Sequence, residues 1–183
     1  MRALLTMILM LQTTMVLADG FRVTSPDLPS GNKMIPQTFV YNGFGCTGQN
    51  ESPALNWSNP PAGTRSFAVM VHDPDAPTGG AGFWHWIVVN LPATMTGLAR
   101  GDGAVNSTHL PHGAIQVRSD YGIEGWGGPC PPAGDRPHRY NFTVYALKVD
   151  HLDIPPGASA SEVGFMITQA AIARATLTAH YAR

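Results

Sequence analysis

Charged side chains are scarce in this sequence, and basic clusters are absent. Asp, Glu, Lys and Arg make up 13% of its 183 residues, with 11 basic against 12 acidic side chains and no polybasic run. A surface that binds nucleic acid needs concentrated positive charge, so we exclude that class of partner. Internal repeats and the periodic glycine of collagen are also missing, while the apolar fraction is an ordinary 44%. A chain of this length and composition is expected to fold as one globular domain.

Long hydrophobic runs are missing too, apart from a short one at the N-terminus. Met1-Arg2 precedes a nearly apolar stretch over residues 3–11, and residues 16–18, Val-Leu-Ala, precede polar Asp19. An N-terminal helix or a membrane anchor is an alternative. However, the run is shorter than the roughly 20 residues of a bilayer span, and no basic stop-transfer segment follows it. We therefore expect residues 1–18 to be a signal peptide and residues 19–183 to be the mature domain, periplasmic or secreted.

Cysteine occurs only twice, at Cys46 and Cys130. In an oxidising compartment an isolated pair is expected to be joined in a disulfide. The alternative is a pair of buried thiols. A bridge would tie the glycine-rich segment around Cys46 to the proline-rich segment around Cys130.

Glycine and proline are plentiful, with 20 and 16 residues, and they separate short apolar segments. Residues 66–71 and 83–91 are nearly continuous apolar runs, typical of strands covered on both faces. Residues 138–149 alternate between two faces and form the clearest strand. Shorter strands are expected at residues 21–23, 38–41 and 114–117. Residues 42–57 and 120–137 are rich in turn-forming residues and are expected to be long loops.

The C-terminal region shows the spacing of a helix. Ser159 and Glu162 form a capping-box pattern, although Gly164 weakens the first turn. Apolar residues then recur at helical spacing, at Met166, Ala170, Ala173, Leu177 and Tyr181. Several strands followed by one helix predict a mainly β fold: a sandwich of two antiparallel sheets with a peripheral C-terminal helix.

Ionisable residues stand where two of these strands meet turns. Asp73 and Asp75 follow the first apolar run in the segment VHDPDAP, whose prolines fix the backbone. His85 lies in the second run, and strict alternation places it on the face of Ile87 and Val89. Taken singly, each feature has a plain structural alternative. The aspartates suit a solvated turn, and the histidine suits a hydrogen-bonded core position.

A third segment, GPCPPAGDRPHRYNF over residues 128–142, leads into the clearest strand. Alternation places His138 and Tyr140 on one face and Arg139 on the other. The prolines leave the preceding loop few conformations, so it would lose little entropy on clamping a ligand. The alternative is that they only make a stiff connection.

In combination, the three segments resemble a known family. DPDAP, a strand containing WHW and VVN, and GPCPP followed by HRY are similar to the two signature regions of the phosphatidylethanolamine-binding family, which includes the Raf kinase inhibitor proteins and plant flowering regulators. The loop GFGCTGQNESPALNW resembles the bacterial branch often called Raf-kinase-inhibitor-like. The resemblance runs in order from about residue 39 to the end of the chain. It implies two antiparallel sheets with a short helical C-terminus.

The resemblance also implies a ligand pocket. At the motif positions the residues expected to bind ligand are Asp73, His85, Gly128, Pro129, His138 and Tyr140, with Gly128-Pro129 supplying wall and backbone amides. Family pockets take phosphate and similar small anions, and some members bind phospholipid head groups. We therefore expect a small anion or a phospholipid head group as ligand, without a metal or cofactor. The resemblance is compatible with a homodimer, and it leaves any protein partner open.

The chemistry of these side chains is consistent with such a ligand. Protonated His85 and His138 would offer charge-assisted donors, so anion affinity is expected to rise as the pH falls through about 6.5, the ordinary histidine pKa. Asp73 could orient a histidine or accept from the ammonium of a zwitterionic head group.

Three other functions compete with the ligand-binding prediction. A hydrolase would need an activated nucleophile, but no G-x-S-x-G elbow is present and prolines flank Cys130. A zinc site built from two histidines and Asp73 lacks the H-E-x-x-H spacing. An interaction protein with a vestigial pocket is the third, and ligand titration separates it from a binding protein. We expect a ligand-binding protein and no enzyme.

Overall fold

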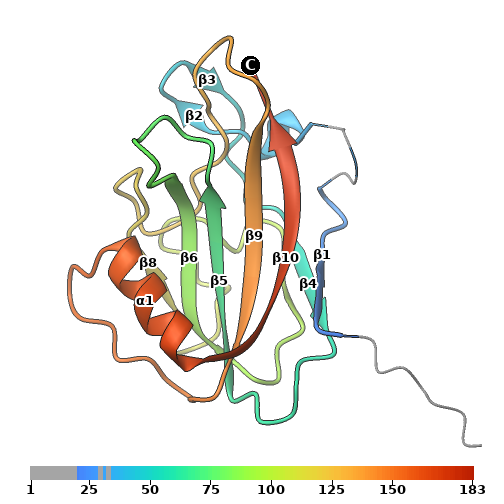
Figure 1. Cartoon of the computed structure of the whole chain (residues 1–183), viewed down its shortest axis with the longest axis vertical. Coiled ribbons are helices and arrows are strands. Elements are labelled where there is room, and N and C mark those ends of the chain that lie inside the picture. The colour runs from blue at the N-terminus through green and yellow to red at the C-terminus, as the bar shows by residue number, and fades with distance from the viewer. Residues whose placement is uncertain (1–19, 29–30, 32–33) are drawn as a thin grey trace, which may run out of the picture.

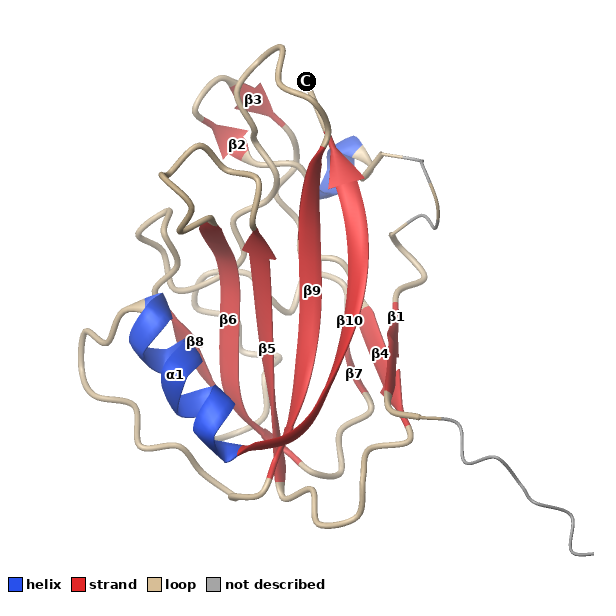
Figure 2. Cartoon of the chain, in the orientation of Figure 1, coloured by secondary structure: helices blue, strands red, loops and turns tan. Residues whose placement is uncertain are grey.

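The computed structural model describes residues 20–28, 31 and 34–183, which fold mainly as β-strands (Figures 1 and 2). The strands are β1 (Arg22–Thr24), β2 (Asn42–Gly43), β3 (Cys46–Thr47), β4 (Leu55–Ser58), β5 (Ser66–Asp73), β6 (Phe83–Pro92), β7 (Gly97–Leu98), β8 (Ile115–Val117), β9 (His138–Leu147) and β10 (Ala171–Tyr181). The helical elements are a 3-10 turn, η1 (Gln37–Phe39), and an α-helix, α1 (Ala160–Ala170). The signal peptide expected at residues 1–18 lies outside the described residues.

The strands form three sheets in which the neighbouring strands are antiparallel. The largest sheet has the order β10-β9-β5-β6-β8, and a smaller one has the order β1-β4-β7. The mainly β fold predicted from the sequence is confirmed. A third sheet, the hairpin β2-β3, falls inside the long loop expected at residues 42–57, because its strands are too short to show a pattern.

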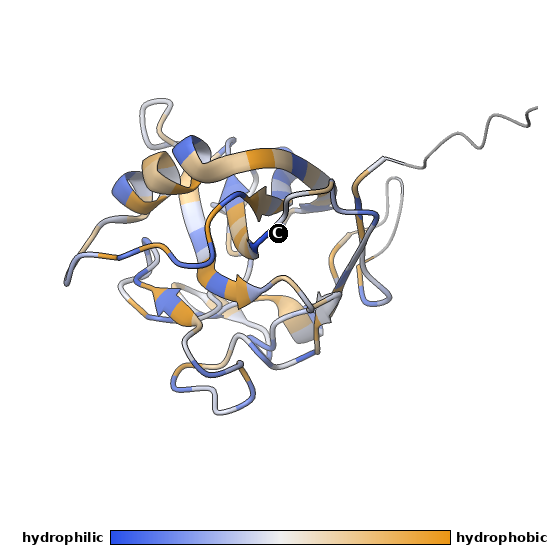
Figure 3. Cartoon of the chain, turned by 90° about the horizontal axis from the view of Figure 1, so that it is seen from below, coloured by the Kyte–Doolittle hydropathy of each residue, from blue (hydrophilic) through white to orange (hydrophobic). Residues whose placement is uncertain are grey.

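The five-stranded sheet separates two hydrophobic cores. One face packs against the three-stranded sheet, where Trp57 of β4 meets Phe67 of β5. The other face packs against α1 through Val163 and Ile167. Figure 3 shows α1 along one side of this sheet. The main sheet is therefore covered on both faces, which explains why β5 and β6 are almost continuously apolar.

The three longest expected strands are present as β5, β6 and β9, and β8 corresponds to the short one expected at residues 114–117. The strand expected at residues 38–41 is wrong. Pro36 and Gln37 accept backbone hydrogen bonds from Phe39 and Val40, which forms the 3-10 turn η1. Phe39 and Val40 are buried all the same, so their apolar character reflected burial rather than a strand.

The helix expected to continue to Tyr181 is only half correct, because α1 ends at Ala170. Residues from Ala171 onward form β10, which pairs with β9 at the edge of the main sheet. Positions four residues apart share a face in a helix and also in a strand, so the apolar spacing was ambiguous. The burial of β10 alternates, and exposed Thr176 and Thr178 lie between its inward-facing residues. Threonine is β-branched and favours a strand, a signal that the apolar spacing alone did not use.

The start of α1 agrees with the prediction. The Ser159 hydroxyl accepts a hydrogen bond from the backbone N–H of Glu162, 3.2 Å away, and so caps the first turn. Within the described part of the chain, no helix is long and apolar enough to cross a membrane.

Candidate functional site

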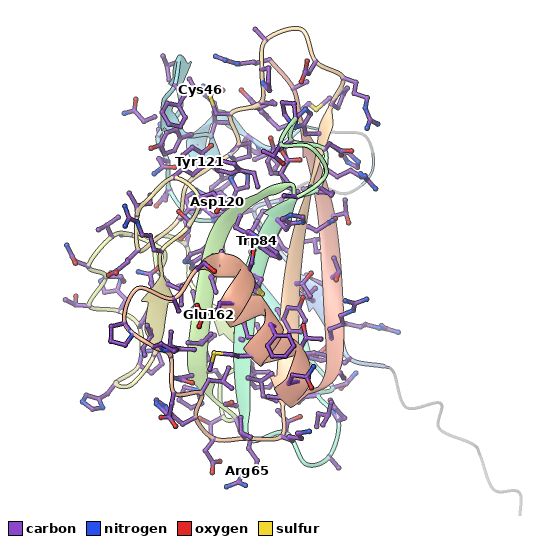
Figure 4. The ribbon with its side chains drawn as sticks, turned by 60° about the vertical axis from the view of Figure 1, so that its left-hand side comes forward. Cys46, Arg65, Trp84, Asp120, Tyr121 and Glu162 are labelled. Carbon is purple, nitrogen blue, oxygen red and sulfur yellow. A yellow bond between two sulfur atoms is a disulfide. The ribbon has the colours of Figure 1, made fainter. Side chains whose placement is uncertain are left out.

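The three sequence segments with ionisable residues meet at one end of the main sheet. β5 runs antiparallel to both β6 and β9, so its last residues lie beside the first residues of those strands. Asp73 pairs with Phe83, and His72 pairs with Asn141. The hairpin β2-β3 and the C-terminus lie at the same end (Figure 1). Figure 4 places Cys46 and Tyr121 there, opposite Arg65.

An irregularity in β6 turns His85 toward this end. Trp84 and Trp86 are paired with the consecutive residues His72 and Val71, so His85 is the extra residue of a β-bulge. The ring of His85 lies with its centroid 5.1 Å from that of Tyr140 on β9. Strict alternation had placed His85 on the face of Ile87 and Val89. The bulge shifts the register by one residue, so His85 lies instead on the face of Tyr140.

A small cavity of about 140 Å³ opens at this point. It is lined by Phe44, Ala76, Pro77, Thr78, Phe83, His85, Tyr121, Cys130, Pro131, Pro132, His138 and Tyr140. The walls are mainly apolar, and His85, His138 and Tyr140 supply most of the polar groups. Lysine and arginine do not occur among the lining residues.

His138 lies between two carboxylates. Its Nδ1 is 2.7 Å from Oδ2 of Asp73, and both side chains are almost fully buried. Its Nε2 is 3.3 Å from Oδ2 of Asp135, whose side chain is 42% exposed. Carboxylate oxygens only accept hydrogen bonds, so the ring can make both contacts only if both nitrogens carry a proton. Through the contact with Nδ1, Asp73 orients the ring of His138. This is the first of the two roles expected for Asp73, the other being to accept from the ammonium of a head group.

His85 is arranged differently. Its Nδ1 donates to the carbonyl of Gly127 over 2.6 Å, and its buried Nε2 has no hydrogen-bond partner among the described residues. Burial lowers the pKa of His85 to about 4, so its ring is neutral near pH 7 and Nε2 is an acceptor. The expected rise in anion affinity through His85 therefore moves well below pH 6.5.

Tyr140 supplies a second free polar atom. Its hydroxyl is buried close to the Asp73 carboxylate and has no well-formed hydrogen bond within the part of the chain that the structure describes. Burial, aided by the negative charge of nearby Asp73, raises the pKa of Tyr140, so the hydroxyl stays protonated. The two residues that carry this nitrogen and this hydroxyl both line the cavity.

Asp75 is in the same turn but serves the scaffold. Its carboxylate accepts from the backbone and guanidinium of Arg139 at 2.8–2.9 Å and from Arg136 at 2.9 Å. These bonds hold the pKa of Asp75 well below its usual range. The backbone N–H of Asp75 donates to Asp73 over 2.8 Å, which fixes the carboxylate of Asp73 in the turn. Arg139 points away from His138, as alternation predicted.

Gly128 and Pro129 adjoin the cavity but are not among its lining residues. The N–H of Gly128 donates to the Asn50 side chain over 2.8 Å, and the carbonyl of Pro129 accepts from the N–H of Tyr41 over 3.1 Å. A Cβ at position 128 would lie 2.1 Å from the Phe39 carbonyl oxygen, so only glycine fits this close approach. A direct contact of these two residues with ligand stays a prediction.

The sulfur atoms of Cys46 and Cys130 are joined, with the Cα atoms 6.0 Å apart. The bond links the hairpin β2-β3 to the loop that precedes β9. Phe44 at the tip of the hairpin is 73% exposed, and both it and Cys130 line the cavity. The disulfide predicted from the sequence is present, and one of its two cysteines, Cys130, forms part of the cavity wall.

Sequence reasoning missed two residues at or beside the cavity, Tyr121 and Asp135. The ring of Tyr121 packs against Phe83 and His85, and its hydroxyl donates to the carbonyl of Gly128 over 2.9 Å. Tyr121 lies in the long glycine-rich loop, where no periodicity predicts a direction. Asp135 was inside the quoted segment, but its spacing from His138 has no meaning outside a regular element. The only sequence feature that could have indicated Tyr121 was the presence of an aromatic residue in a loop rich in turn-forming residues.

Groups of three or more His, Cys, Asp or Glu side chains able to hold a metal ion were not found in the described ranges. His138 already contacts two carboxylates, and His85 donates from Nδ1 to a carbonyl. Each of the two histidines is therefore held by hydrogen bonds to other groups of the protein.

Lowering the pH from 7 to 5 is expected to reduce the free energy of unfolding by about 2 kcal/mol. His85 has a pKa of about 4 when folded and 6.5 as its ordinary value. Between these values the unfolded chain binds a proton that the folded chain does not. The free energy of unfolding therefore decreases as the pH is lowered. Asp27 and Asp75 also have lowered pKa values, but their ordinary value of 3.8 keeps them out of this range.

Urea unfolding at the two pH values measures this dependence. His85→Gln should lose most of the dependence, whatever its absolute stability. Equal slopes with pH in the wild type and the variant would show that His85 is not the responsible group.

Comparisons with known proteins identify the family of the chain. Residues 24–182 match the family model described as phosphatidylethanolamine-binding protein. YbcL of Escherichia coli K12 is 49% identical over 164 residues, which cover 90% of this chain and 88% of that protein. The crystal structure of Escherichia coli YbcL, described as a new member of the mammalian PEBP family, has a TM-score of 0.86 at 48% identity and covers 90% of this chain and 99% of its own.

Two further relatives extend the comparison. YbhB of Escherichia coli K12 is 46% identical over 160 residues, covering 87% of this chain and 99% of that protein. A putative lipoprotein of Mycobacterium tuberculosis, LppC, is 42% identical over 160 residues, covering 87% of this chain and 71% of that protein. The chain therefore belongs to the phosphatidylethanolamine-binding protein family.

Proposed function

We propose that this chain is an exported ligand-binding protein whose cavity receives a phosphate-like group or a phospholipid head group, without catalysing a reaction. One observation carries the proposal: His85 and Tyr140 line one cavity, and neither Nε2 of His85 nor the hydroxyl of Tyr140 has a well-formed hydrogen bond to the described residues. An unsatisfied buried polar atom costs about 1–3 kcal/mol. Two of them beside one cavity are explained if a ligand satisfies them.

The two atoms suit an oxygen acid that retains one proton. Its O–H would donate to the neutral Nε2 of His85, and another of its oxygens would accept from the hydroxyl of Tyr140. A phosphate monoester, whose second pKa is about 6, has this form in part at neutral pH. This arrangement needs no lysine or arginine, and none lines the cavity.

The size of the cavity favours a head group over a whole lipid. Its volume of about 140 Å³ is below the roughly 300–1,000 Å³ of typical ligand sites. The apolar rim, which includes Phe44, Pro131 and Pro132, would contact carbon atoms next to the phosphate. Any acyl chains would have to remain outside.

The state of the possible nucleophiles among the described lining residues supports binding rather than catalysis, since burial keeps the Tyr140 hydroxyl protonated. The Thr78 hydroxyl donates to the carbonyl of Gly82 over 2.9 Å, and Cys130 is in the disulfide. A hydrolase would need an activated nucleophile beside a base.

Export is supported by three observations. The N-terminus has the pattern of a signal peptide. The two cysteines are joined, as is usual in oxidising compartments. One relative is described as a putative lipoprotein. We place the protein in the periplasm or outside the cell.

Tyr140→Phe is expected to weaken the binding of phosphate and phosphorylethanolamine about tenfold. The substitution removes only the hydroxyl, which has no well-formed hydrogen bond among the described residues, so stability should stay equal or rise by about 1 kcal/mol. Opposite effects on binding and stability are not expected of a purely structural tyrosine. Calorimetric titration and urea unfolding provide the two measurements.

Tyr145→Phe is the matched control, because Tyr145 lies on the same strand and packs on the other face of the sheet. It should leave ligand affinity unchanged. If neither phosphate nor phosphorylethanolamine binds the wild type, the pocket is vestigial and an interaction protein becomes the better description.

A further inference from the structure

Asp135 contacts the ring nitrogen of His138 that Asp73 does not hold. Its Oδ2 lies 3.3 Å from Nε2 of His138, while Asp73 holds Nδ1 of the same ring. His138 lines the cavity, and Asp135 stands beside it in the loop that precedes β9. The one ring nitrogen of His138 that does not serve the buried pair therefore already contacts a carboxylate of the protein itself.

The loop that carries Asp135 is held at several points. The disulfide fixes Cys130, and the Arg183 side chain donates to the carbonyl of Pro131 over 2.6 Å. The N–H of Gly134 donates to the carbonyl of Arg183 over 3.1 Å, and Arg136 contacts Asp75. The backbone of Asp135 is thus well positioned, while its side chain is 42% exposed to solvent.

The charges around His138 disfavour an added anion. Asp73 and Asp135 present two carboxylates to the His138 ring, and even a fully protonated ring, with one positive charge, would not balance both. The cavity lining contains no lysine or arginine to compensate, and His85 is neutral. An anionic group would have to displace the carboxylate of Asp135 or lie beside it, whereas an ammonium group would be attracted to it.

We propose that Asp135 is a specificity-determining residue, which penalises free anions in the cavity and favours ligands that carry a positive group beside the anionic one. The inference rests on the proposed function, because it concerns the charge preference of the same cavity. The sequence alone does not predict this role, because Asp135 lies in a loop without periodicity.

Asp135→Asn removes the charge and keeps the shape. We expect phosphate to bind the variant about tenfold more tightly than the wild type, since a like charge next to the site is removed. Phosphorylethanolamine should gain much less, because its ammonium loses an attractive partner. Its affinity relative to phosphate should therefore fall by several-fold. Calorimetric titration of both compounds measures the ratio.

Two further variants isolate the role of the charge. Asp135→Glu retains the carboxylate and should retain the wild-type ratio. Asp153→Asn removes the same charge from a fully exposed position beyond β9, and should leave both affinities unchanged.

Each outcome decides a different statement. Equal affinity ratios in the wild type and Asp135→Asn would overturn the role of Asp135 while leaving the ligand-binding function intact. A parallel loss of both affinities would assign Asp135 a structural role instead, which also overturns the inference. Absence of binding in every variant would overturn the proposed function, and the charge preference with it.

Discussion

Replacing Cys46 and Cys130 together by serine is expected to lower the free energy of unfolding by about 4 kcal/mol. The two residues are 84 positions apart, so the bond closes a long loop and strongly restricts the unfolded chain. A strained bond would contribute less, and structure in the reduced unfolded state would have the same effect. Urea unfolding of the variant and of the oxidised wild type measures the difference.

The same substitution should weaken ligand binding. Phe44 and Cys130 line the cavity from two segments that the bond holds together, so its loss frees part of the rim. Wild-type protein treated with reductant is the matched control and should show the stability of the double variant. Two titratable thiols in denatured, unreduced protein from its native compartment would contradict the bond itself.

Much of the fold could be predicted because the long strands are regular. β9 alternates along its length, and β5 and β6 are continuous apolar runs bounded by prolines. These signals depend only on residue types within each strand. β10 shows the limit of such signals, since its spacing of four residues fits a helix and a strand equally well. Pairing with β9, a contact distant from any local pattern, decided between them.

The site could be predicted only in part: His85, His138 and Tyr140 line the cavity, whereas Asp73, Gly128 and Pro129 are not among its lining residues. The motifs led to Asp73, His85, His138 and Tyr140, which the structure brings to one end of the main sheet. Their roles differ from the simple expectation of two equivalent histidines. A bulge directs His85, and its carbonyl partner and burial keep it neutral.

His138 departs further, because its second nitrogen contacts a carboxylate from the adjacent loop. Loops that lack periodicity give no direction for their side chains, so neither Asp135 nor Tyr121 could be placed from the sequence. The polarity of the cavity therefore follows from tertiary contacts.

Replacing Asp73 by alanine is expected to lower the free energy of unfolding by about 3 kcal/mol or more. The carboxylate accepts from Nδ1 of His138 over 2.7 Å and from the N–H of Asp75 over 2.8 Å. Both Asp73 and His138 are almost fully buried, so the substitution leaves a charged or polar ring without its partner and without water. Urea unfolding measures the loss of stability.

The effect of Asp73 on binding can be separated from its effect on stability. Asp73→Asn keeps an acceptor oxygen of the same shape, so it should cost less stability than Asp73→Ala while still removing the charge that orients His138. If orientation of His138 matters for the ligand, Asp73→Asn should weaken phosphorylethanolamine binding at a temperature where the variant is fully folded. Asp153→Ala provides the exposed control and should change neither property.

A fully stable Asp73→Ala protein would mean that the buried pair contributes nothing to the fold. A folded Asp73→Asn protein with unchanged affinity would restrict Asp73 to the scaffold and leave His85 and Tyr140 as the principal ligand contacts.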